Sequence, residues 1–253
     1  MVSSQGVTPV DLVPSAYRLR PSVALKGPSV ESDKLQVFLA EQEKQLHDSF
    51  SAEAYHNLPE WPNLAQLELA IGAALKHLSY PKGREVRRVK KLWGLTRLMG
   101  LAYGGPAYHD VISAEVVVAS HEDLPSSKFW KWTCVAHEVV HAQGFTREMD
   151  TEIITWLAFY LSTDPMKQNF ARMMLLQKSG QEFQWPAELL GEFKRVREER
   201  KKVQAEQWLV SFFRTLGESS GVQNSGAKYG TVSKGKKIPE DHEFFRSVYK
   251  MAH

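Results

Sequence analysis

The sequence has little of several features that mark common classes of protein. It contains one cysteine, Cys134, in 253 residues, which excludes an internal disulfide and a metal site built from CxxC pairs. No run reaches the roughly 18 uncharged apolar residues of a membrane-spanning helix, because Arg97 interrupts the closest candidate. The first residues lack the charged and apolar regions of a signal peptide. As written, the chain is therefore expected to be soluble, and any metal site in it must use histidine and carboxylate ligands.

The charge of the chain is nearly balanced. Lys plus Arg number 32 and Asp plus Glu 29, a net charge of +3, so no overall field would attract nucleic acid or anionic lipid. The basic runs at residues 84–91 and 194–202 are interpreted as solvated helix faces. A nucleic-acid-binding or membrane-binding surface at these runs is an alternative, and the near-neutral total charge counts against it.

The chain divides into an extended, proline-containing strap at residues 1–32 and a single domain at residues 33–253. Apolar residues at helical spacing predict a mostly helical domain, and the segment 111–120 is the best candidate for a strand because it is rich in β-branched residues. The expected fold class is α+β with a short sheet. Helices are expected near residues 33–50, 64–78, 82–100, 128–141, 147–162, 165–178, 186–217 and 241–252.

The motif HEVVH, residues 137–141, is the strongest functional signal. On a helix His137 and His141 lie one turn apart, so both imidazoles can reach one ion while Glu138 reaches the same side. Such a pattern occurs about 0.03 times in a shuffled chain of this composition, so its context must support it. The supporting features are the strand just upstream, Gly144 to end the helix, and the carboxylate-rich segment that follows.

Zinc bound by three protein ligands acidifies a water molecule in its fourth position, and Glu138 would then act as general base. The third ligand must come from Glu148, Asp150 or Glu152, because Arg147 stands where a third histidine would be needed. Glu148 and Glu152 share a helix face, so we favour Glu148 as the ligand. Glu152, with Asp150 as a further candidate, would accept the free N–H of a ligand histidine.

The stretch HEVVHAQGFTREMDTE resembles the gluzincin class of zinc metallopeptidases, in which a Glu from the following helix completes the site. More closely, it resembles an uncharacterised bacterial family of membrane-anchored HExxH proteins, whose members read HExxHxxGF and then R-E-x-E-A-N. The chain keeps the residues up to Glu148 but has Asp150, Thr151 and Glu152 where the family has Glu, Ala and Asn. The segments YGGPAYHDVISAE and SGVQNSGAKYGTV resemble the family's flanking elements.

The resemblance implies a zincin-like domain and further site residues. Val116, Val117 and Val118 would lie along the cleft and pair with an extended peptide. Tyr229 would stabilise the oxyanion, with His109 and His121 as weaker candidates. It also implies membrane helices upstream of Met1, and therefore a bacterial membrane-associated or extracytoplasmic protein.

The sequence thus predicts a zinc metallopeptidase, an endopeptidase that binds one Zn²⁺ and acts on a peptide or protein rather than a nucleic acid. The main alternative is a non-catalytic binding or scaffold module that zinc stabilises.

Overall fold

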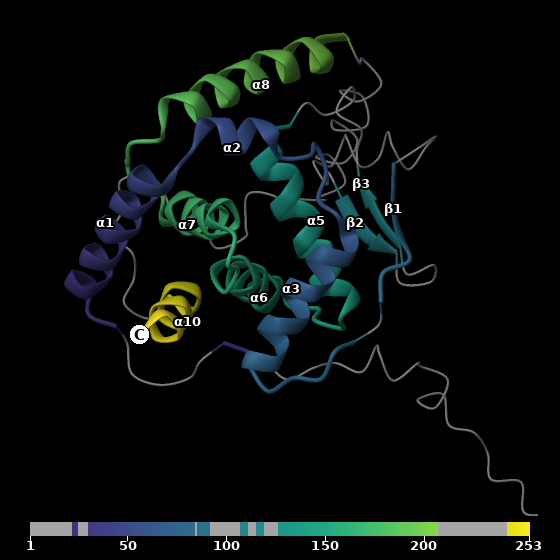
Figure 1. Ribbon diagram of the computed structural model, residues 1–253, viewed down its shortest axis with the longest axis vertical. Coiled ribbons are helices and arrows are strands. Elements are labelled where there is room, and N and C mark those ends of the chain that lie inside the picture. The colour runs from purple at the N-terminus through teal and green to yellow at the C-terminus, as the bar shows by residue number, and fades with distance from the viewer. Residues whose placement is uncertain are drawn as a thin grey trace, which may run out of the picture.

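Helices make up most of the described chain, and a small three-stranded sheet lies to one side of them (Figure 1). The computed structural model describes residues 22–24, 30–83, 85–91, 107–110, 115–118, 126–206 and 242–253. The helices are α1 (Ser32–Ser49), α2 (Ala52–Asn57), α3 (Leu64–His77), α5 (Lys128–Ala142), α6 (Glu148–Tyr160), α7 (Pro165–Ser179), α8 (Ala187–Glu206) and α10 (Glu243–Ala252). The strands are β1 (Arg88–Lys91), β2 (Ala107–Asp110) and β3 (Glu115–Val118). The expected mostly helical α+β architecture is confirmed.

Helix α6 lies at the centre of the helical part, with α3, α5, α7 and α10 packed around it (Figure 1). Its side chains Ile153, Ile154 and Leu157 are fully buried, as a helix that is apolar on most faces should be. The buried apolar side chains form one contiguous cluster, which extends from Val23 in the N-terminal segment to Val248 in α10.

None of the helices in the described ranges is both long enough and apolar enough to cross a lipid bilayer.

The helices around the HExxH motif begin and end where local signals place them. Ser127 caps α5, since its hydroxyl accepts a hydrogen bond from the backbone N–H of Trp130 at 3.2 Å. Gly144 follows the helix with φ 93°, a conformation that glycine adopts without strain. Asp164 caps α7 in the same way, and Pro165 occupies the first helical position.

The sheet has the strand order β1-β3-β2, with β1 parallel and β2 antiparallel to the central strand β3. All four side chains of β3 are buried. The strand expected at residues 111–120 is therefore confirmed for Glu115–Val118, and its remaining residues lie outside the described ranges. Helix α5 packs against β2 and β3 (Figure 1), which places the motif helix between the sheet and α6.

The prediction of a helix across residues 82–100 is wrong for the residues of β1. There the chain is extended, and Val89 packs beside the core while its neighbours hold the buried carboxylate of Glu115. The Nε atom of Arg88 lies 2.5 Å from that carboxylate, and Lys90 also donates to it. These partners stand 25 and 27 residues away along the chain, so they override the local helical preference of the basic run. Residues 92–100 lie outside the described ranges.

Candidate metal centre

Two elements bring three potential metal ligands together. His137 and His141 project from successive turns of α5, and Glu148 is the first residue of α6. Gly144 allows the tight turn between the two helices, which returns the chain to the histidines. One donor atom from each of the three side chains lies within 4.8 Å of the other two. A His/His/Glu group of this kind can hold one metal ion.

The donor atoms approach one another closely. The two Nε2 atoms of the histidines lie 3.1 Å apart. Glu148 places its Oε2 atom 2.9 Å from Nε2 of His137 and its Oε1 atom 3.5 Å from Nε2 of His141. The two imidazole planes cross at 82°, and the short distance between their Nε2 atoms shows that both rings point these atoms into the same space. All three side chains are partly exposed, which leaves a route for an ion to enter.

The backbone and α6 fix the orientation of His141. Its Nδ1–H donates a hydrogen bond to the carbonyl oxygen of Phe145 at 2.6 Å, and the hydroxyl of Thr151 lies 3.3 Å from the same nitrogen. Nδ1 therefore carries the proton, and Nε2 keeps its lone pair for a metal. The predicted partner for a ligand histidine was a carboxylate; the structure supplies a carbonyl and a hydroxyl instead.

The cluster shifts the pKa of two of its members. Burial lowers the pKa of His141, but hydrogen bonds to Glu148 and to the Phe145 carbonyl, together with the negative charge of Glu138, raise it to a net value above 6.5. Burial raises the pKa of Glu148, but its hydrogen bonds with His137 and His141 lower it well below 4.5. Glu148 is thus ionised at neutral pH, as a metal ligand must be.

Glu138 is buried and only 8% exposed. Its charge raises the pKa of His141 and, after burial, is the second cause that raises the pKa of the Cys134 thiol. Cys134, Glu138 and His141 share one face of α5, so the carboxylate of Glu138 is close enough to act on both of the others. Cys134, which is only partly buried, stays a neutral thiol and is not a member of the ligand group.

Asp150 does not contact the histidines but anchors the N-terminal segment. Its buried Oδ1 atom accepts hydrogen bonds from the hydroxyl of Ser22 at 2.7 Å and from the backbone N–H of Val23 at 3.1 Å. Arg147 donates to the same Ser22 hydroxyl and, with two distances of 2.9 Å, to both carboxylate oxygens of Glu243 in α10. The start of α6, which carries Glu148, is therefore tied to segments near both ends of the chain.

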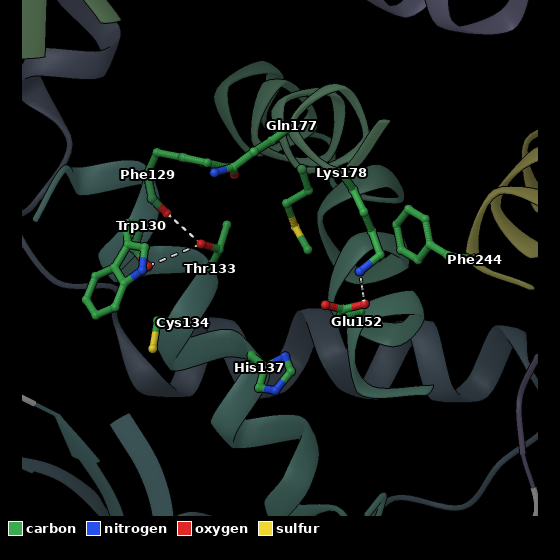
Figure 2. A pocket seen from close by; sticks show the side chains of 10 residues that line it. Phe129, Trp130, Thr133, Cys134, His137, Glu152, Gln177, Lys178 and Phe244 are labelled. Atoms are coloured by element: carbon green, nitrogen blue, oxygen red, sulfur yellow. Dashed lines mark hydrogen bonds and ion pairs between the residues drawn. The ribbon is translucent and has the colours of Figure 1, made fainter. Parts of the chain in front are cut away.

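Glu152 also lies away from the ligand nitrogens, because its carboxylate accepts a hydrogen bond from the ammonium of Lys178 in α7. The pair lines a pocket of about 400 Å³ that has His137 at one end (Figure 2). The expectation that Glu152 holds a ligand histidine does not match this arrangement. No local sequence signal could have shown that Glu152 pairs with Lys178, since Lys178 stands 26 residues further along the chain.

The other expected site residues divide into two groups. Val116, Val117 and Val118 belong to the central strand, whose two edges are already paired with β1 and β2, so this strand cannot also pair with a peptide. Tyr229 and His121 lie outside the described ranges, and His109 stands in β2, of which only the backbone is described.

Comparisons with known proteins add no identification: no family model matches the chain, and searches of curated proteins and of solved structures find no match. The geometry of the His137, His141 and Glu148 group is therefore the main ground for a functional conclusion.

Proposed function

We propose that the protein is a zinc-dependent peptidase with a zincin-like domain, in which His137, His141 and Glu148 hold one zinc ion. The observation that carries the proposal is the spacing of the three donor atoms. Two ligands of a tetrahedral zinc ion are about 3.4 Å apart, given zinc–ligand bonds of about 2.0–2.1 Å. The two Nε2 atoms are 3.1 Å apart, and the nearest carboxylate oxygens of Glu148 lie 2.9 Å from Nε2 of His137 (Oε2) and 3.5 Å from Nε2 of His141 (Oε1), all close to that value.

The chemistry of the donors also suits zinc. Two imidazole nitrogens and one carboxylate form a borderline set that fits zinc, whereas calcium and magnesium prefer sites made of oxygen atoms. The Phe145 carbonyl, which fixes the tautomer of His141, is the type of support that ligand histidines usually have. Three protein ligands leave a fourth position open, the arrangement of catalytic rather than structural zinc sites.

A bound zinc ion would polarise the peptide carbonyl and make a water molecule acidic enough to react at neutral pH. The chain's own residues would handle the protons. Glu138 would take a proton from the attacking water and deliver it to the nitrogen of the leaving amine, so that water adds across the peptide bond and an acid and an amine leave. Its position on α5 suits this role, because it stands between the two histidines in sequence and is close enough for its charge to raise the pKa of His141.

The substrate would be an extended peptide. Within the described sheet, β2 pairs with β3 and packs against α5 (Figure 1). The backbone of β2, rather than that of Val116–Val118, is therefore the edge to which a peptide strand could add. The resemblance of the motif to gluzincins and to the membrane-anchored HExxH family supports the same proposal.

The direct test is the Glu138→Gln variant, assayed with a mixed library of internally quenched peptides. We expect zinc content equal to that of the wild type and hydrolysis reduced by at least about 100-fold, the range that general-base catalysis supplies. Glu53→Gln, on the exposed face of α2, is the matched control and should keep full activity. Full activity in Glu138→Gln would contradict the proposed mechanism. A wild type that binds zinc and cleaves none of the peptides would instead indicate a zinc-stabilised binding module.

A further inference from the structure

The pocket beside the candidate metal centre follows one face of α5 away from the ligands. Trp130, Thr133 and His137 stand on successive turns of that face and line the pocket (Figure 2). At a rise of about 1.5 Å per residue, the stretch from Phe129 to His137 spans about 12 Å. A volume of about 400 Å³ lies in the range of sites that bind small organic groups. The pocket can therefore receive a large side chain whose backbone lies at the metal.

The pocket wall combines polar side chains, Gln177 among them, with an apolar part that is largely aromatic. Phe129 and Trp130 contribute from α5, Met174 from α7 and Phe244 from α10. Figure 2 shows the Phe244 ring on the side opposite Trp130. That ring is fully buried, and the ammonium of Lys178 lies 5.1 Å from its centroid, so Trp130 and Met174 offer the accessible apolar surface. Aromatic rings bind other rings through offset or edge contacts, and thioethers also contact ring edges favourably. Such a wall favours an aromatic occupant over an aliphatic or strongly polar one.

The charged part of the wall is the pair between Glu152 and Lys178. Lys178 is 8% exposed and Glu152 19% exposed, so both ions have lost most of their water, which is costly for a pair that serves packing alone. A cation in the pocket would meet Lys178, and an anion would meet Glu152. A neutral hydrogen-bond donor can instead bind Glu152, because a carboxylate has about four acceptor positions and Lys178 does not occupy all of them.

We propose that this pocket binds a tyrosine side chain of the substrate, with the ring against Trp130 and Met174 and the phenol O–H donated to Glu152. Glu152 and Lys178 would then determine specificity at a position next to the cleaved bond. The position relative to cleavage rests on the proposed peptidase function; the binding of tyrosine does not.

The first experiment measures binding to the zinc-loaded protein by ligand-observed NMR, with N-acetyl amides of tyrosine, phenylalanine and alanine as probes. We expect tyrosine to bind about tenfold more tightly than alanine, within the range that one apolar pocket supplies, and more tightly than phenylalanine. Peptides with tyrosine next to the scissile bond should show the same order in kcat/KM.

Two variants separate the shape of the pocket from its charge. Thr133→Trp fills the pocket. The Thr133 hydroxyl donates to carbonyls of its own helix, at 2.9 and 3.2 Å, so its loss breaks no hydrogen bond between helices in the described part of the chain. The double variant Glu152→Leu with Lys178→Met replaces the ion pair by apolar groups of similar size, a change that buried pairs often tolerate. Its control is Glu198→Leu with Lys201→Met, which removes an exposed pair on α8.

The expected result is that Thr133→Trp abolishes binding of both aromatic probes at unchanged zinc content. The double variant should keep phenylalanine binding and lose the advantage of tyrosine, while the α8 control keeps both. Equal binding of the three probes by the wild type, or a tyrosine advantage that survives in both pocket variants, would overturn the proposal. Tyrosine binding that follows the variants without any peptide cleavage would support the pocket and contradict the peptidase function. Cleavage without preference for tyrosine would support the peptidase function and contradict the proposed role of the pocket.

Discussion

The tie between Arg147 and Glu243 should control how well the third ligand is held. Arg147 directly precedes Glu148, and its guanidinium contacts both carboxylate oxygens of Glu243 at 2.9 Å. In Glu243→Gln one oxygen becomes an amide N–H that faces the guanidinium, and the negative charge is lost. We expect the start of α6, and with it Glu148, to become less well positioned.

The expected size of the effect on stability and on zinc affinity follows from the exposure of the Arg147–Glu243 pair and from its indirect link to the metal site. Arg147 is 49% and Glu243 32% exposed, so solvent screens the pair and its loss should lower the free energy of unfolding by only about 1 kcal/mol. Groups that orient metal ligands change metal affinity by about 10- to 100-fold. Because Arg147 acts on Glu148 through the backbone, we expect the lower end, a loss of about tenfold in zinc affinity.

The assay is a competition titration against a chromophoric zinc chelator, with urea unfolding in parallel. Glu31→Gln is the matched control, since it removes an exposed carboxylate that pairs with Lys34 at the start of α1. The control should leave zinc affinity unchanged. A zinc dissociation constant for Glu243→Gln within twofold of that of the wild type would refute the positioning argument.

Three further predictions follow from the geometry. Phe170→Ala should lower the free energy of unfolding in a urea titration by about 4 kcal/mol, because the buried ring has Phe129, Trp132 and Phe159 within 6 Å between centroids; a loss below 1 kcal/mol would argue against this packing. Gly144→Ala should cost about 1–3 kcal/mol through the strain of its positive φ and should weaken zinc binding, since it displaces the Phe145 carbonyl that holds His141. In the metal-free protein, the raised pKa of His141 gives a stabilisation that is complete below pH 6.5 and is lost as the pH rises through the folded-state pKa of His141. The lowered pKa of Glu148 gives a stabilisation that is complete above pH 4.5 and is lost as the pH falls through the folded-state pKa of Glu148. The contribution of this cluster to stability should thus be largest between about pH 4.5 and 6.5, whereas zinc affinity should rise with pH above 6.5; unfolding curves of the wild type and His141→Gln that share one pH dependence would contradict this assignment.

Features encoded by neighbouring residues were predictable from the sequence. The cap at Ser127, the turn at Gly144 and the proline at the start of α7 act within four residues of the backbone that they shape. The pairing of His137 with His141 follows from helical spacing, and Glu148 follows from the shortness of the turn. The three-ligand group of the candidate site could therefore be predicted without knowledge of the tertiary fold.

Features that depend on distant partners were not predictable. The basic run at β1 resembles a helix face by composition, and only its pairing with β3 makes it a strand. Asp150 and Glu152 are acidic residues near the start of α6, like Glu148, but Ser22 and Lys178 draw their carboxylates elsewhere. Helix α2, with six residues, is too short to show a helical period, although Ser51 caps it.

The central claim is that His137, His141 and Glu148 bind one zinc ion, and the metal content of the purified protein tests it most directly. Elemental mass spectrometry should find about one zinc per chain in the wild type and in His77→Ala, a control on the exposed face of α3. His141→Ala and Glu148→Ala should lose the metal while keeping their helical circular dichroism. Zinc absent from the wild type even after reconstitution, or retained in full by His141→Ala, would contradict the claim.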